Sequence, residues 1–171
     1  MNSMTWAVAS PPYRTPFEVA RDFTEEAPVD LQAMAAALGV SVDMEADLGP
    51  DVSGRICRRR DSGGSDQFRI EVNGAHPWRR RRFTLAHEIA HFLLHRDLLG
   101  QGIEDNEMYR SGLPDPIEYE ANRFAAELLM PAKLVRTAYR SGAKAIVPLA
   151  DAFDVSAEAM RVRLKELRLA P

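Results

Sequence analysis

The stretch RRFTLAHEIAHFLLH, from Arg81 to His95, carries three histidines spaced four residues apart. Residues i and i+4 of a helix lie on the same side, so His87 and His91 can reach one metal ion. Glu88 lies about 100° round the helix from His87, where a carboxylate can contact a water on the metal without binding the metal. This HExxH arrangement is typical of zinc hydrolases whose glutamate is the general base.

The third histidine, His95, cannot share that metal with His87, because eight helical residues rise about 12 Å and zinc–nitrogen bonds are about 2 Å long. We therefore expect His95 to pack beside the site or to support a ligand. The alternative is an ordinary amphipathic core helix. Only 4 histidines occur in the chain and three fall on this stripe. Buried imidazoles and carboxylates are costly without partners, which favours the metal site.

A third ligand is expected on a second helix, because catalytic zinc usually has three protein ligands. The segment IEYEANRFAAELLMP, Ile117 to Pro131, supplies the candidates. We predict Glu120, which lies four residues before the apolar Phe124 and so points inward from the same face. Glu118 and Glu127 are the rivals, and a salt bridge from Glu120 to an arginine is the structural alternative.

The remaining parts of the predicted site are less specific. A His/His/Glu set indicates Zn²⁺, although Mn²⁺ or Fe²⁺ would also fit. Tyr119 and Tyr109 are candidate donors to a tetrahedral intermediate, the second from a long loop over Leu99–Pro116. That loop either gates substrate entry or is a solvated connection.

Composition sets broad limits on the class of protein. The chain has 171 residues, 46% hydrophobic and 27% charged, which is enough for one domain with a core. A net charge of −3 argues against nucleic acid or an anionic membrane as the main partner. The single cysteine, Cys57, excludes an intramolecular disulfide and a cysteine-based zinc site. We expect a cytoplasmic protein, and no apolar run approaches the roughly 18 residues of a membrane helix.

Local patterns predict an α+β fold, mostly helical with a small sheet. Thr15 to Glu18 forms a capping box for a helix to about Glu26, and Asp30 caps a second helix that ends at Gly39. The segments GRICRRR and QFRIEVN alternate around DSGGSD, which predicts a hairpin over about 54–73 with Cys57 in a structural position. Further helices are predicted over about 83–98, 115–129, 132–141, 144–152 and 156–168.

Two basic segments raise the question of nucleic-acid binding. We expect the run Arg79–Arg82 to pair with nearby acids rather than with DNA phosphates, because it is short and the net charge is negative. The tail VPLADAFDVSAEAMRVRLKELRL has helix-turn-helix proportions, with Ser156 as a cap and Arg161, Arg163, Lys165 and Arg168 near its end. Those cations complement the helix dipole as well as they would complement DNA. We expect a packing or partner-docking role first and DNA binding second.

The paired motifs RRFTLAHEIAHFLLH and EYEANRFAAELLMP resemble the ImmA/IrrE family of metallo-endopeptidases, over roughly Pro28 to Arg168. The resemblance implies a compact, gluzincin-like zincin fold with the small sheet packed on the HExxH helix. It also implies His87, His91 and Glu120 as metal ligands and Glu88 as catalytic base. Asn122 matches a family position to which we assign only a supporting place beside the site.

The resemblance further implies a role in transcription regulation, in which a helix-turn-helix repressor or antitoxin is cleaved. The expected organisation is a flexible arm over 1–14, a metallopeptidase domain over 15–142 and a helical subdomain over 143–171. Two alternatives are a binding module of the same fold that does not cleave, and a DNA-binding regulator. The intact Glu88 argues against the first alternative, and the negative net charge argues against the second.

Overall fold

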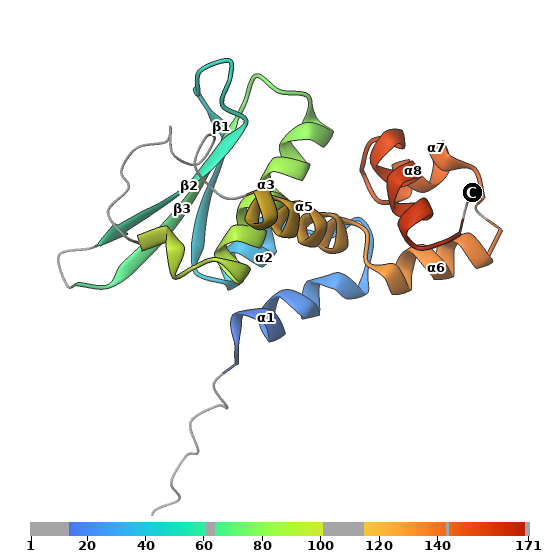
Figure 1. Ribbon diagram of the computed structural model, residues 1–171, viewed down its shortest axis with the longest axis horizontal. Coiled ribbons are helices and arrows are strands. Elements are labelled where there is room, and N and C mark those ends of the chain that lie inside the picture. The colour runs from blue at the N-terminus through green and yellow to red at the C-terminus, as the bar shows by residue number, and fades with distance from the viewer. Residues whose placement is uncertain (1–13, 61–63, 101–114, 143, 170–171) are drawn as a thin grey trace, which may run out of the picture.

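The computed structural model describes residues 14–60, 64–100, 115–142 and 144–169. The elements in this part run in the order α1 (Pro16–Asp22), η1 (Phe23–Glu25), α2 (Leu31–Ala37), β1 (Val40–Ala46), β2 (Gly54–Arg60), β3 (Asp66–Asn73), α3 (Trp78–Leu94), η2 (Leu98–Gly100), α5 (Asp115–Leu129), α6 (Ala132–Arg140), α7 (Ile146–Ala152) and α8 (Ala157–Glu166). Figure 1 shows the sheet at one end of the molecule, α3 and α5 across the middle, and α6, α7 and α8 at the other end. The predicted α+β class, with more helix than sheet, is confirmed.

The first two helices begin where local capping chemistry predicts. The Thr15 hydroxyl accepts a hydrogen bond from the Glu18 N–H, and the Glu18 carboxylate accepts one from the Thr15 N–H, which completes the capping box. Asp30 caps α2 by accepting from the N–H of Ala33. The turn after α2 contains Gly39 at φ 75°, a left-handed conformation that favours glycine.

The sheet has the strand order β1-β3-β2. Strands β2 and β3 pair antiparallel, with Ile56 opposite Ile70, so the predicted hairpin is confirmed. Strand β1 pairs parallel with β3, with Val40 opposite Phe68. The sequence did not predict this pairing, because parallel strands are joined by a crossover rather than by a short turn with its own signature.

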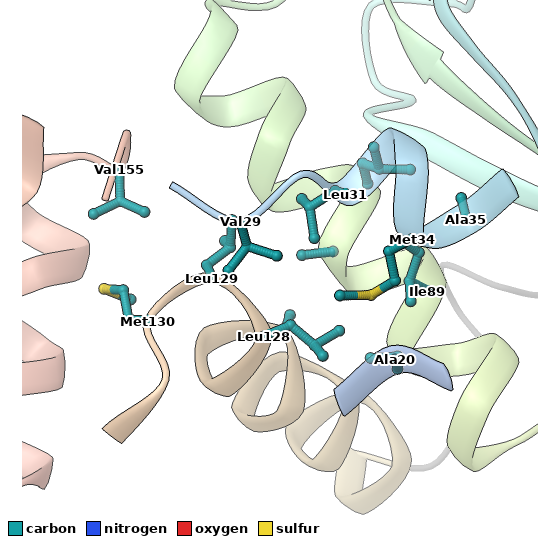
Figure 2. Close-up of a cluster of buried hydrophobic side chains, with 14 of the residues drawn as sticks. Ala20, Val29, Leu31, Met34, Ala35, Ile89, Leu128, Leu129, Met130 and Val155 are labelled. Carbon is teal, nitrogen blue, oxygen red and sulfur yellow. The ribbon is translucent and has the colours of Figure 1, made fainter. Parts of the chain in front are cut away.

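A continuous apolar core lies between the sheet and the helices, because alternate residues of β3 point to one face. Phe68, Ile70 and Val72 are buried on that face. Figure 2 shows how the core continues from Leu31 and Met34 of α2 to the end of α5. The labelled side chains there that are apolar and buried are Ala20, Val29, Ala35, Ile89, Leu128, Leu129, Met130 and Val155.

Helix α3 starts at Trp78, five residues before the predicted start, and it ends at Leu94 rather than near residue 98. The prediction was wrong because it followed the apolar period and stopped at the arginine run, although arginine is a good helix former. As expected, the arginines pair with acids. Arg79 contacts Asp151 at 2.6 Å, and Arg81 contacts Glu45.

The C-terminal helices are attached to the first turns of α3 and to the end of α5. The Trp78 indole N–H donates to Asp154 at 2.6 Å, and the Arg82 guanidinium lies 3.2 Å from the same carboxylate. Asp154 has φ 50° in the turn between α7 and α8. On the other side, Arg163 of α8 donates to the carbonyl oxygen of Met130 at 3.0 Å. Polar contacts therefore tie α7 and α8 to both helices that carry the predicted site.

Three predictions concern residues outside the described ranges. These are the predicted arm over 1–14, of which residues 1–13 lie outside, Tyr109, and the predicted loop over Leu99–Pro116, of which residues 101–114 lie outside. Within the described ranges, no helix combines the length and the apolar character that a membrane crossing requires.

Candidate metal centre

Helices α3 and α5 pack against each other in opposite directions, and the candidate site lies where they face each other. Contacts from His87 to Asn122 and from His91 to Glu118 show the antiparallel alignment. The alanines next to these residues are fully buried, each 0% exposed, and small side chains allow the two backbones to approach closely. They are Ala86 and Ala90 of α3 and Ala121 and Ala125 of α5.

Three possible ligand atoms converge between these helices. The Nε2 atoms of His87 and His91 are 3.0 Å apart. The Glu118 carboxylate lies 3.4 Å from the Nε2 of His87 and 3.3 Å from that of His91. Among the described residues, this trio is the group of histidine, cysteine and acidic side chains arranged closely enough to hold a metal ion.

The partner of the Nδ1 atom of each histidine determines which of its two ring nitrogens carries the proton. The Nδ1 of His87 lies 3.1 Å from the amide oxygen of Asn122, which can only accept, so Nδ1 carries the proton. The Nδ1 of His91 lies 3.2 Å from the Nδ1 of His95. When His91 donates there, both Nε2 atoms present lone pairs toward each other and toward a carboxylate. Such converging acceptors repel one another unless a cation lies between them.

Burial keeps the two imidazoles neutral, which is the form that binds metal. Desolvation, together with the neighbouring His87 and His95, lowers the pKa of His91 to about 3. Desolvation also lowers the pKa of His87, although Glu118 and Asn122 act in the opposite direction. Proton competition for these nitrogens is therefore weak at neutral pH.

The separations fit a tetrahedral ion. Ligands about 2.0–2.1 Å from zinc in tetrahedral geometry are about 3.3 Å from one another. The Nε2 atoms of His87 and His91, 3.0 Å apart, are close to that edge length. Each of them lies at a similar distance from one oxygen of the Glu118 carboxylate, 3.4 Å from Oε2 for His87 and 3.3 Å from Oε1 for His91. Two imidazoles and a carboxylate leave the fourth position open, as in catalytic zinc sites.

The structure places Glu118, rather than the predicted Glu120, beside the two histidines. The Glu120 side chain is 63% exposed, and its carboxylate lies 3.3 Å from the Nε2 of His95. Glu127, the other rival, pairs with Arg163. Glu120 is therefore brought to the outer part of the site and Glu118 to the centre.

The helix geometry of α5 explains this difference. At 100° per residue, Glu118 lies about 20° from Ala125 and Leu129, whereas Glu120 lies about 140° and 180° from them. Both of these reference residues are buried, while Phe124, which the prediction used to mark the inner face, is only partly buried. The alanines mark the face that packs on α3, and their spacing from Glu118 was the available signal.

Glu88 is buried, 6% exposed, and lies on the side of α3 that faces the sheet. One of its carboxylate oxygens would be 3.7 Å from a Cβ on Gly54, the first residue of β2. It is not in the cluster of possible ligands. This placement agrees with a carboxylate beside the metal position rather than on it.

The other predicted site residues fall into two groups. His95 and Asn122 contact the outer nitrogens of the two candidate ligand histidines, so both support the site. Tyr119 is 70% exposed, and this placement gives no support to its predicted role as donor.

The C-terminal cations are partly used within the fold. Arg163 is buried and contacts Met130, Glu127 and Glu166. Arg161, on the surface of the same helix, pairs with Glu158. Internal contacts therefore take up Arg163, one of the four cations that the sequence analysis considered for DNA binding.

The mixed fold combines a buried HExxH helix with a facing glutamate in a group of side chains that could hold a metal ion. The family of IrrE N-terminal-like domains, the M78 peptidases, matches residues 35–165, and the chain belongs to this family. The resemblance inferred from the paired motifs is thereby confirmed, and membership implies a divalent metal.

Two known proteins are similar to parts of the chain. The radiation response metalloprotease IrrE of Deinococcus deserti is 43% identical over 97 residues, which are 54% of this chain and 34% of that protein. A transcriptional regulator of Mycobacterium tuberculosis has a similar structure, with a TM-score of 0.53 and 21% identity, over 88% of this chain and 46% of that one. This second likeness concerns the fold alone. The chain spans about a third of the first protein and just under half of the second.

Proposed function

We propose that the chain is a zinc-dependent endopeptidase whose ligands are His87, His91 and Glu118 and whose general base is Glu88. The observation that carries the proposal is the convergence of two imidazole Nε2 atoms and one carboxylate, with a buried glutamate next in sequence to the first imidazole. Mn²⁺ and Fe²⁺ accept the same donors, so zinc is proposed from ligand type.

Each residue has a distinct part in the proposed reaction. When bound, zinc polarises the peptide carbonyl and lowers the pKa of water. Glu88 accepts a proton from the attacking water at its carboxylate and then delivers it to the leaving amine. Asn122 holds the ring of His87 through Nδ1. Burial of Glu88 against the start of β2 shields its carboxylate from bulk water.

The proposed substrate is a regulatory protein of the helix-turn-helix repressor or antitoxin type. The proposal extends the resemblance of the paired motifs, and it agrees with similarity to a protein named a radiation response metalloprotease. A cytoplasmic setting follows for such a substrate.

The test compares wild type with Glu88→Gln, Glu118→Gln and the distant control Glu158→Gln. Metal content after incubation with excess zinc is measured by elemental analysis. Wild type, Glu88→Gln and Glu158→Gln should each hold close to one zinc, and Glu118→Gln should hold much less. Cleavage is followed by mass spectrometry on purified helix-turn-helix repressors and antitoxins and on proteins retained by immobilised Glu88→Gln. The expected result is cleavage by wild type and the control, and a loss of about 10²–10⁴-fold in Glu88→Gln.

The outcomes separate the proposed peptidase from a binding module. Retained biological activity in Glu88→Gln would show that the fold binds a regulator without cleaving it. Full zinc in Glu118→Gln would remove Glu118 from the ligand set.

A further inference from the structure

A line of three side chains leads outward from the candidate metal position through His91. The Nδ1 of His91 lies 3.2 Å from the Nδ1 of His95, and the Nε2 of His95 lies 3.3 Å from the carboxylate of Glu120. His91 and His95 lie one turn apart on α3, and Glu120 reaches them from α5. The line therefore joins the two helices on the side of His91 that faces away from the metal position.

One distribution of protons satisfies every atom in this line. Metal binding at the Nε2 of His91 requires its proton to be at Nδ1, which then donates to the Nδ1 of His95. That acceptor must be free of a proton, so His95 carries its proton at Nε2 and donates it to Glu120. Glu120, which is mostly exposed to solvent, accepts as a carboxylate. The opposite arrangement would direct the N–H of His91 toward the metal position and would exclude the ion.

The two ligand imidazoles are supported unequally. His87 has a neutral amide oxygen, that of Asn122, at its outer nitrogen. His91 is 1% exposed, and behind it stand a second imidazole and then a negative charge. An acceptor at the outer nitrogen fixes the ring orientation and increases the basicity of the ligating nitrogen, and more strongly so when it is charged.

We propose that Glu120 and His95 form a relay that positions His91 and strengthens its bond to the metal, which makes His91 the dominant imidazole ligand. The inference rests on the metal site proposed above. It gives the glutamate in the EYEAN segment a function different from that of a ligand. Both relay residues are positioning residues, because they act through His91.

The experiment measures zinc affinity without any substrate. Metal-free protein competes with a chromophoric chelator for added zinc, in wild type, Glu120→Gln, His95→Ala and the double variant, with Glu158→Gln as control. Glu158 is an exposed glutamate on α8 with a surface ion pair, so its replacement removes the same charge at a distance. Glu120 is the safer position for folding, because its side chain is mostly in solvent.

The relay predicts a specific pattern. Zinc affinity should fall about 10–100-fold in His95→Ala, in the range typical for groups that support a metal ligand, and about 3–10-fold in Glu120→Gln. The double variant should equal His95→Ala, because Glu120 acts through His95. Glu158→Gln should match wild type. In zinc-loaded wild type, ¹⁵N NMR of labelled histidines should show the His95 proton at Nε2.

Three results would overturn the relay. These are equal affinity in Glu120→Gln and Glu158→Gln, a full additional loss in the double variant, or a His95 proton at Nδ1. Because cleavage is not measured, failure of the peptidase proposal leaves this comparison intact. Absence of zinc binding in wild type would overturn the metal site and the relay together.

Discussion

Gly54 lies where the sheet comes closest to the helix that carries the HExxH motif. A Cβ at this position would be 2.4 Å from the Cγ2 of Thr84, 2.9 Å from the carbonyl oxygen of Glu71 and 3.7 Å from a carboxylate oxygen of Glu88. The first two contacts are too short for carbon. The carbonyl belongs to the β3 backbone and Thr84 lies within α3, so neither can move alone.

Gly54→Ala should therefore lower the free energy of unfolding by about 2–3 kcal/mol, in the upper part of the range for one added methyl group in a packed region. Backbone strain does not contribute to this loss of stability, since Gly54 is not among the described glycines with positive φ. The measurement is urea denaturation of metal-free protein. The shift of β2 away from α3 should also lower peptide hydrolysis, because Glu88 lies at the same contact.

A second substitution tests the assigned cause. Thr84→Ser removes the Cγ2 but retains the hydroxyl that donates to the carbonyl oxygen of Arg80. In the Gly54→Ala background it should restore about half of the lost stability, because the 2.9 Å contact with Glu71 remains. Stability of Gly54→Ala within about 0.5 kcal/mol of wild type, or no recovery with Thr84→Ser, would refute the steric argument.

Other substitutions test separate parts of the fold. Arg163→Met should lower the free energy of unfolding by about 2–3 kcal/mol in urea denaturation, because the buried guanidinium contacts a carbonyl oxygen and two carboxylates. The control Arg161→Met removes only an exposed ion pair and should lower it by less than about 0.5 kcal/mol. Equal losses in the two variants would contradict the role of Arg163 in attaching α8 to the end of α5. In metal-free protein the pKa of His91 is about 3 when folded and 6.5 as the ordinary value, so the unfolded chain takes up the proton first. The free energy of unfolding should then fall as the pH drops from about 6.5 toward 3, by up to about 1.4 kcal/mol per pH unit. His91→Leu should reduce the change in urea midpoint between pH 7 and 5. An unchanged slope in this variant would show that His91 is not the titrating group. Asn73→Asp should lower stability by about 3 kcal/mol in thermal unfolding, since the Asn73 amide donates to three carbonyl oxygens that a carboxylate would repel; an unchanged melting temperature would exclude this amide as the anchor of residues 48–52.

Features encoded by neighbouring residues were predictable from the sequence. The capping box at Thr15, the cap at Asp30 and the β2–β3 hairpin each depend on contacts within a short segment. The pair His87 and His91 also follows from one helical turn. Such features require no knowledge of what the rest of the chain does.

Features that depend on distant partners were not predictable in the same way. The parallel pairing of β1 with β3 involves no tight turn between the two strands whose sequence could predict it. The choice between Glu118 and Glu120 depends on which face of α5 meets α3, and alanine is a weaker hydrophobic marker than Phe124. The early start of α3 was not predicted because the arginines of its first turns pair with acidic residues that are distant in sequence, on β1, α7 and the turn that follows α7.

The four buried alanines between α3 and α5 have a consequence for the origin of the ligand cage. Small methyl groups allow the two helix backbones to lie close together, so packing of the core contributes to holding the possible ligand atoms within 4.8 Å of one another. Folding thus supplies the free energy that brings two lone pairs and a carboxylate together, and an arriving ion relieves their repulsion without having to organise them. Such a cage favours ions that match its size over ions that would require the helices to separate.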